Sequence, residues 1–298
     1  MTNRTFTIPA AHGATLIAEE ILPEHTPTEG TPTVVLAHGW CMARESWHKV
    51  IGELLTHRDV RTVIYDQRGH GQSTMGDLPQ ASVKVLGDDM HRVIQTTTPD
   101  GPLVLAGHSM GGMSIMAYAG QHHEDLAARV RGTVLASTAA SIEGRDPVPL
   151  EGLIMFVAAH APSIAPHQLV PILAQGRLMF GQRPNKEDVK HAIRQIQHTK
   201  MPTIGKFFTA LADHHEVDAL AHFVDVPTHI LSGTRDRLIP VSHSDALKRE
   251  IPHADLTVLP GRGHMLPYEA ADAIADAIIS LFDGTLVPMH QEDYERAV

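Results

Sequence analysis

A serine stands between two glycines, each two residues away, in the hexapeptide GHSMGG at positions 107–112. The hexapeptide follows an apolar run, residues 102–106, and precedes a segment with helical character, residues 113–122. A residue on such a tight strand-to-helix turn has a strained backbone, and bulky side chains two positions before and after it would clash. The pattern therefore predicts that Ser109 is a nucleophile whose hydroxyl stands clear of the sheet.

A histidine and a carboxylate follow two later predicted strands and could activate this serine. His264 lies in a glycine-containing loop directly after the run 255–259, and Asp236 lies just beyond the strand expected at 226–231. An imidazole can accept the serine proton during attack and return it to the leaving group, while a carboxylate holds its tautomer and stabilises the imidazolium. Ser109, Asp236 and His264 are thus predicted to form a catalytic triad.

Two backbone N–H groups are candidates for stabilising the negative oxygen that forms during attack. Met110 follows the nucleophile at the start of a predicted helix, and Trp40 follows the dipeptide His38-Gly39 at the end of the run 33–37. Two such donors suffice for an oxyanion hole. Cys41 comes next in the chain, and because no base adjoins it we expect a pocket wall or buried filler rather than a catalytic thiol.

The segment DQRGHGQS at 66–73 resembles a tight loop held by its own hydrogen bonds, because glycines separate its polar residues. We expect Asp66 and Arg68 to pair and fix this loop. A catalytic role for Asp66 is the weaker interpretation, because Asp236 is better placed to reach a histidine.

Short apolar runs predict the sheet that carries these residues. Continuous runs of this type are typical of strands buried on both faces, and they alternate with segments of helical spacing, such as 82–96 and 269–282. An additional hairpin, residues 4–9 and 15–22, is expected to form an antiparallel edge. The predicted buried strands are 33–37, 61–65, 102–106, 132–136, 226–231 and 255–259.

The alternation of strand and helix stops between residues 141 and 225. Helical pieces are expected there at 152–161, 167–180, 186–198 and 202–213, and we interpret the region as a cap over the carboxyl edge of the sheet. The predicted division is a core of 1–140 and 226–283, a cap of 141–225 and a polar tail of 284–298. Some apolar cap residues would pack the cap itself, and others would favour acyl or aromatic substrates; they are Leu153, Ile154, Met155, Phe156, Met179, Phe180, Phe207 and Phe208.

Composition excludes several classes of function. The 298 residues carry 24 Lys and Arg against 34 Asp and Glu, a formal charge of −10 without a basic cluster, so nucleic acid is not an expected partner. No apolar run is long enough to span a bilayer, so stable membrane insertion is not expected. The chain has 22 histidines, but their spacing matches no metal motif, and we expect neither metal nor cofactor. One cysteine and an N-terminus without an apolar core predict a cytoplasmic location.

These motifs resemble the α/β-hydrolase fold family from about residue 4 to residue 282, in the order nucleophile, acid, base. The resemblance implies a mostly parallel central sheet flanked by helices, with a helical cap inserted between the sixth and seventh strands. GHSMGG is similar to the elbows of carboxylesterases and monoacylglycerol lipases, which implies hydrolysis of a small-molecule ester through an acyl-serine intermediate. The serine disfavours dehalogenases and epoxide hydrolases, which use aspartate.

Alternatives remain open on the same residues. The same triad can catalyse thioester hydrolysis, acyl transfer, C–C bond hydrolysis or perhydrolysis, because the shape and chemistry of the pocket determine which acceptor reacts. A ligand-binding protein on a hydrolase fold is a further alternative, since fold does not fix function. The sequence makes no prediction of the oligomeric state.

Overall fold

The computed structural model describes residues 2–142, 158–160 and 179–282. A single eight-stranded sheet runs through this part of the chain in the order β1-β2-β4-β3-β5-β6-β7-β8. β1 and β2 form the predicted antiparallel hairpin at one edge, and the strands from β4 to β8 are parallel. The strands are β1 Thr2–Pro9, β2 Thr15–Leu22, β3 Thr33–Ala37, β4 Thr62–Tyr65, β5 Leu103–His108, β6 Val130–Ala136, β7 Thr228–Gly233 and β8 Asp255–Leu259.

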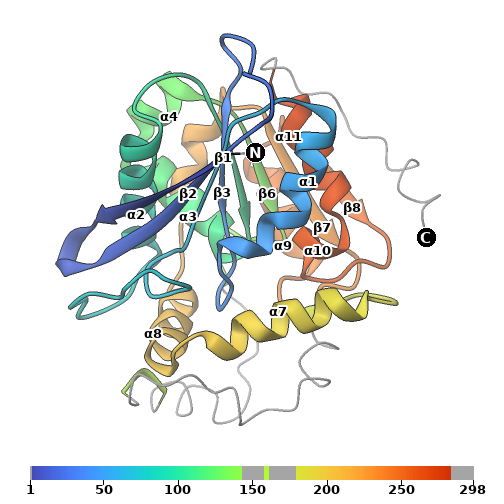
Figure 1. Cartoon of the computed structure of the whole chain (residues 1–298). Helices are drawn as coiled ribbons and strands as arrows, with labels where there is room; N and C mark the ends of the chain where they lie inside the picture. The colour runs from blue at the N-terminus through green and yellow to red at the C-terminus, as the bar shows by residue number, and fades with distance from the viewer. Residues whose placement is uncertain (1, 143–157, 161–178, 283–298) are drawn as a thin grey trace.

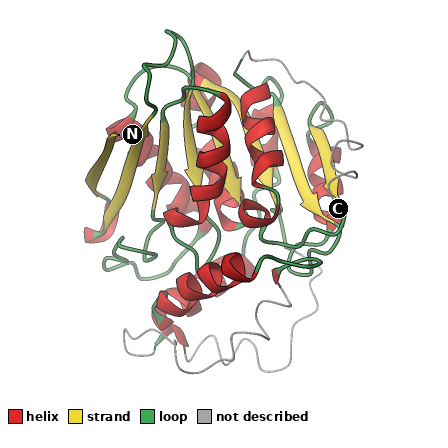
Figure 2. Ribbon diagram, turned by 45° about the vertical axis from the view of Figure 1, so that its right-hand side comes forward, coloured by secondary structure: helices red, strands yellow, loops and turns green. Residues whose placement is uncertain are grey.

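Helices cover both faces of the sheet (Figures 1 and 2). Because side chains alternate along a strand, Val35 and Leu105 enter a core with α2, α3 and α9, while Leu36 and Val104 enter one with α1 and α11. The helices are α1 His48–His57, α2 Val83–Thr97, α3 Met110–Gln121, α4 His123–Arg129, α7 Lys186–His198, α8 Met201–Ala212, α9 Val241–Glu250, α10 Leu266–Glu269 and α11 Ala271–Ser280. This is the predicted α/β-hydrolase architecture.

The prediction of one continuous helix over residues 269–282 is wrong. Residues 269–282 were expected to form a single helix, but the structure has α10 and α11, separated at Ala270 with φ −149° and ψ 50°. The break leaves Glu269 at the end of α10, where its carboxylate accepts hydrogen bonds from a neighbouring loop. Helical periodicity alone does not reveal a break of one residue.

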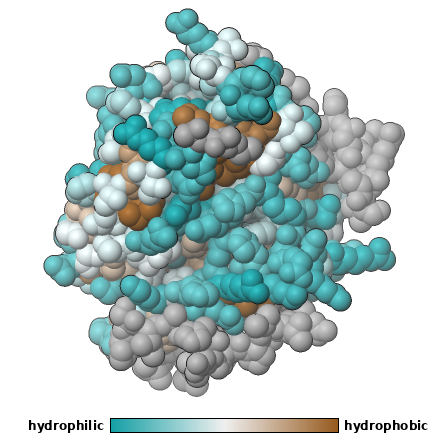
Figure 3. Space-filling view, viewed as in Figure 1, coloured by the Kyte–Doolittle hydropathy of each residue, from teal (hydrophilic) through white to brown (hydrophobic). Residues whose placement is uncertain are grey.

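Two helices of the region between β6 and β7, α7 and α8, lie at one end of the sheet (Figures 1 and 2). α7 begins where the Asn185 side chain accepts the Glu187 N–H at 2.8 Å, an N-cap that fits the predicted start. Figure 3 shows a largely hydrophilic band where α7 crosses this face, because the helix buries only Ala192 and Ile193.

Hydrogen bonds attach these helices to loops that follow the carboxyl ends of β3 and β4. Thr199 Oγ1 donates to the Cys41 carbonyl at 3.1 Å, and Thr203 Oγ1 donates to the Gly69 carbonyl at 3.0 Å. The helices predicted at 152–161 and 167–180 lie outside the described residues, apart from 158–160 and 179–180, and so do Leu153–Phe156 and the tail 284–298. The division into core, cap and tail stays a prediction.

The predicted pairing of Asp66 with Arg68 is wrong. Asp66 instead binds the Arg44 guanidinium and accepts the Arg44 and Gln72 N–H groups, both at 2.9 Å. Arg68 instead donates to both oxygens of Asp89, at 2.6 and 2.7 Å. Both partners lie outside the loop and far from it in sequence, so local spacing could not identify them.

Replacement of Arg68 by methionine is expected to destabilise the protein by about 3–5 kcal/mol, because it leaves the Asp89 carboxylate buried without its partner. Arg68 is 0% and Asp89 1% exposed, and burial already raises the pKa of Asp89. Urea unfolding measures the change. Lys190→Met removes the exposed Lys190–Glu187 pair as a control, with an expected loss far smaller than that of Arg68→Met. An equal loss in the two variants would contradict the prediction.

Candidate active site

Ser109 occupies the turn between β5 and α3. Its φ of 53° and ψ of −120° place it in a region that non-glycine residues rarely adopt. The turn is held at both ends of the residue: Ser109 N–H donates to Ala136 O at 2.9 Å, and Thr138 Oγ1 donates to Ser109 O at 2.8 Å. Strain held in this way by surrounding structure is typical of functional sites.

The glycines on either side of Ser109 allow backbones to approach closely. A Cβ on Gly111 would lie 2.0 Å from the Ala37 carbonyl oxygen in β3, and one on Gly107 would lie 2.5 Å from the Gly111 carbonyl. Neither neighbour is a flexible side chain that could move aside. A residue without a side chain is therefore required at both positions.

Gly111→Ala is expected to destabilise the protein by about 3 kcal/mol, since either α3 or β3 must shift to accommodate the methyl group. Gly52→Ala is the matched control, because Gly52 lies in α1, where a Cβ meets nothing within 4 Å. That substitution should stabilise by about 0.5–1 kcal/mol through the helix preference of alanine. Urea unfolding of both variants checks the prediction, and a stabilised Gly111→Ala protein would contradict it.

His264 and Asp236 are hydrogen-bonded, with 2.8 Å between Nδ1 and Oδ2. A carboxylate only accepts, so Nδ1 carries the proton and Nε2 is left free to accept one. The other Asp236 oxygen accepts the N–H groups of Leu238 and Ile239 at 2.9 and 2.8 Å. Burial alone would raise the pKa of Asp236, but His264 and these N–H groups together lower it.

The loop that carries His264 is fixed from three directions. His264 N–H donates to Met179 O at 2.7 Å, and His264 O accepts from His108 Nε2 at 2.7 Å. Glu269 accepts the N–H groups on either side, those of Gly263 and Met265, at 3.1 Å each. Sequence reasoning missed His108 and Glu269, because their partners become neighbours only after folding.

The structure brings the predicted nucleophile and base to the same edge of the sheet. His108 directly precedes Ser109, and its ring centroid lies 5.0 Å from that of His264. Burial lowers the pKa of His108 to about 3, so this ring is neutral and its Nε2–H can donate to the His264 carbonyl. Ser109, Asp236 and His264 are all at most 9% exposed.

The two predicted oxyanion donors lie beside Ser109. A Cβ on Gly39 would come within 3.3 Å of the Ser109 Cβ, so the loop that carries Trp40 runs next to the nucleophile. Met110 is the first residue of α3, and the first N–H groups of a helix have no partner within it. Their role as oxyanion donors stays a prediction.

Cys41 lies beside this loop and is inert by its environment. It is 6% exposed with φ 61°, and burial raises the pKa of its thiol. A thiol with a raised pKa supplies little thiolate, which is the reactive species. Within the described ranges, the structure contains no group of three or more His, Cys, Asp or Glu side chains that could hold a metal ion. The same residues include no helix long and apolar enough to cross a membrane.

Comparison with known proteins gives matches over most of the chain. The chain is 29% identical over 263 residues to a protein of Pseudomonas putida named dihydrolipoyllysine-residue acetyltransferase component of the acetoin cleaving system, covering 85% of this chain and 64% of that protein. It is 26% identical over 266 residues to an sn-1-specific diacylglycerol lipase of Mus musculus, covering 84% of this chain and 80% of the lipase.

Among solved structures, an esterase from Exiguobacterium antarcticum matches with a TM-score of 0.77 at 21% identity, over 94% of this chain and 100% of the esterase. This likeness concerns the fold. A family model for the alpha/beta hydrolase fold matches residues 32–271, which include Ser109, Asp236 and His264. The chain therefore belongs to the alpha/beta hydrolase fold family and is an enzyme of the hydrolase class.

Proposed function

We propose that this enzyme hydrolyses carboxylic esters through an acyl-serine intermediate, with Ser109 as nucleophile, His264 as general base and Asp236 as its partner. The proposal rests above all on the 2.8 Å hydrogen bond from His264 Nδ1 to Asp236, at the sheet edge that presents the strained Ser109 turn. That bond leaves His264 Nε2 as an acceptor, which is the state that a general base requires.

The reaction would proceed in two steps. Ser109 Oγ attacks the ester carbonyl while His264 Nε2 takes its proton, and the carbonyl oxygen becomes an oxyanion facing the N–H groups of Trp40 and Met110. The imidazolium returns the proton to the leaving alcohol, and the acyl group remains on Ser109. Water then repeats the sequence with the acyl-enzyme and releases the acid.

The substrate is proposed to carry an apolar acyl or aromatic part. Trp40, which follows Gly39 in the oxyanion loop, packs against Phe208 of α8 with 6.1 Å between ring centroids. Phe207 and Met110 belong to the same apolar cluster, which connects α8 to the start of α3. Aromatic and aliphatic walls with a few polar groups are typical of small-molecule sites. A cytoplasmic location stays a prediction from composition.

The test is a series of p-nitrophenyl esters, from acetate to laurate, with Ser109→Ala protein as the blank. Turnover above the blank, together with a fluorophosphonate adduct mapped by mass spectrometry to Ser109, is the expected result. A maximum at short chains would indicate a carboxylesterase, and one at long chains a lipase. Turnover that persists in Ser109→Ala would contradict the proposal.

The acceptor is tested in the same assay. The Pseudomonas putida relative has an acetyltransferase name, so transfer to an acceptor other than water is a second candidate. Adding an alcohol or thiol and measuring the ratio of acid to transferred product separates the two. Acid as the main product supports hydrolysis, and preferential transfer at low acceptor concentration would assign acyl transfer.

A further inference from the structure

The peptide bond between Gly39 and Trp40 contains one of the two proposed oxyanion donors. Its carbonyl oxygen, on Gly39, lies 2.8 Å from Nδ1 of His38 and also accepts the Met42 N–H at 3.1 Å. In a trans peptide the C=O and N–H bonds point to opposite sides of the plane. Whatever holds the Gly39 carbonyl therefore also aims the Trp40 N–H.

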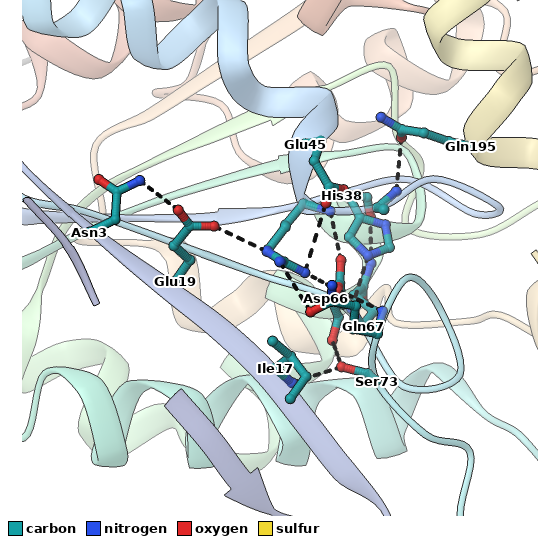
Figure 4. Close-up of polar contacts among 12 residues, drawn as sticks. Asn3, Ile17, Glu19, His38, Glu45, Asp66, Gln67, Ser73 and Gln195 are labelled. Atoms are coloured by element: carbon teal, nitrogen blue, oxygen red, sulfur yellow. Dashed lines mark hydrogen bonds and ion pairs between the residues drawn. The ribbon is translucent and has the colours of Figure 1, made fainter. Parts of the chain in front are cut away.

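A second contact decides which nitrogen of His38 carries the proton. The backbone N–H of Gln67 lies 2.9 Å from His38 Nε2 (Figure 4). A backbone N–H can only donate, so Nε2 is the acceptor and the proton of the neutral ring is on Nδ1, facing Gly39 O. His38 is 0% exposed, and burial lowers the pKa of its ring to about 4, which keeps it neutral at physiological pH.

The side chain of Gln67 connects this loop to the other donor. Its Nε2 donates to the His38 carbonyl, and its Oε1 accepts from Ser114 Oγ at 2.7 Å. Ser114 Oγ also lies 2.9 Å from the carbonyl of Met110, in the first turn of α3. Gln67 is 0% exposed and bridges the two segments that carry the Trp40 and Met110 N–H groups.

We infer that His38 and Gln67 are positioning residues of the oxyanion hole. Gln67 selects the Nδ1–H tautomer of His38, and that N–H holds the Gly39–Trp40 peptide with the Trp40 N–H directed toward the developing oxyanion. Neither side chain touches the reacting atoms. The inference rests on the proposed acyl-serine function, and it adds two residues that the triad pattern does not contain.

Two amide replacements of His38 separate positioning from simple packing. Asparagine can place its amide nitrogen near the position of Nδ1, so His38→Asn keeps the donation to Gly39 O and leaves the Gln67 N–H unpaired. Glutamine reaches further, so His38→Gln places a carbonyl near the position of Nε2, pairs the Gln67 N–H and loses the donation. Gly39 O keeps its bond from Met42 in both variants.

A positioning role and a purely structural role of His38 predict opposite orders of activity for the two variants. An unpaired buried N–H is costly, whereas Gly39 O is never left without a donor, so a purely structural role makes His38→Asn the less stable and less active protein. Positioning makes His38→Gln the less active protein, although it is the more stable one. The stability order and the kcat order should therefore be reversed with respect to each other.

The expected result is a fall in kcat of about 10²-fold for His38→Gln and of less than about 10-fold for His38→Asn, with KM changed less than about threefold. Because an aryl trifluoromethyl ketone forms an oxyanion on Ser109, its inhibition constant should follow kcat rather than KM. His70→Asn is the matched control: the His70 ring packs 5.4 Å from that of His38, but its Nδ1 is hydrogen-bonded to Arg68 O, and the kcat of the variant should stay within about twofold of wild type.

Several outcomes would overturn the inference. A kcat for His38→Gln equal to or above that of His38→Asn would do so, and so would losses confined to KM or to stability. The proposed function is judged separately, by comparing wild type with Ser109→Ala. If wild type turns over no ester, the rate of Ser109 phosphonylation replaces kcat in the same ranking, and an unreactive Ser109 would overturn the function and the inference together.

Discussion

Asp236→Asn is expected to lower kcat for ester hydrolysis by about 10⁴-fold with little change in KM. The structure shows how the amide would be oriented. One Asp236 oxygen accepts the N–H groups of Leu238 and Ile239, so the amide oxygen of asparagine must face these two donors. Its NH₂ group then faces His264 and donates to Nδ1, which moves the imidazole proton to Nε2. A protonated Nε2 cannot accept the proton of Ser109.

The chain offers a matched control for this substitution. His229 Nδ1 lies 3.3 Å from Asp255 Oδ2, in another histidine–aspartate pair, which joins β7 and β8. Asp255→Asn should leave kcat within about twofold of wild type. Steady-state kinetics on one p-nitrophenyl ester measures both variants. An Asp236→Asn enzyme that keeps more than about a tenth of wild-type kcat would show that Asp236 is not the partner of the base.

The protein is expected to lose stability steeply as the pH falls below about 6.5. In the described part of the chain, burial holds four histidine rings neutral, because it lowers the pKa of His38 and His214 to about 4 and of His70 and His108 to about 3. In the unfolded chain these rings titrate near pH 6.5. At every pH between this value and the lower pKa of the folded state, the unfolded state therefore binds more protons than the folded state. Their stabilising contribution is therefore complete above about pH 6.5 and is lost as the pH falls toward 4 and 3.

The expected size follows from proton counting. Each ring contributes at most about 1.4 kcal/mol per pH unit, so four contribute at most about 5.5 kcal/mol per unit. Asp89, Glu216 and Glu269, whose pKa values burial raises, oppose this loss in part. Between pH 6.5 and pH 5 the four rings together lose at most about 8 kcal/mol, so a domain at the lower end of the ordinary range of about 5–15 kcal/mol would unfold near pH 5.

Urea unfolding at intervals from pH 8 to pH 5 measures the slope. Above pH 7 these rings are neutral in both states, so the same protein provides its own reference there. His70→Asn should reduce the slope by about 1.4 kcal/mol per pH unit, because an amide keeps the donation from the Nδ1 position to Arg68 O and does not titrate. A slope that does not change in this variant would contradict the assignment of His70 as a neutral buried ring.

Much of the fold could be predicted because its signals are local. The strand expected at 33–37 coincides with β3 (Thr33–Ala37), and the helix expected at 186–198 coincides with α7. Continuous apolar runs and an N-cap depend only on residues that are neighbours in the sequence, so they can be recognised without knowledge of the tertiary structure. The break at Ala270 was missed, since it depends on what Glu269 contacts rather than on periodicity.

The residues of the candidate site likewise fall into those with a local sequence signal and those without one. Ser109, Asp236 and His264 follow strand ends and glycines, so their types and spacing predict a triad, and the structure joins two of its members, Asp236 and His264, by a hydrogen bond. The partner of Asp66 was predicted wrongly as Arg68, because a loop sequence does not show that Arg44 lies across it. His38, Gln67 and His108 act through tertiary hydrogen bonds, for which the sequence has no local signal.

The bond from His264 N–H to Met179 O has a consequence for exchanging parts between relatives. Gln182 N–H also donates to Gly261 O at 2.8 Å. Residues 179–182, near the middle of the region between β6 and β7, are therefore hydrogen-bonded to the loop that carries His264. A chimaera that replaced this whole region to change substrate range would also replace the support of His264. A chimaera that retains residues 179–182 of this protein would exchange the rest of the region without removing the hydrogen bonds that support His264.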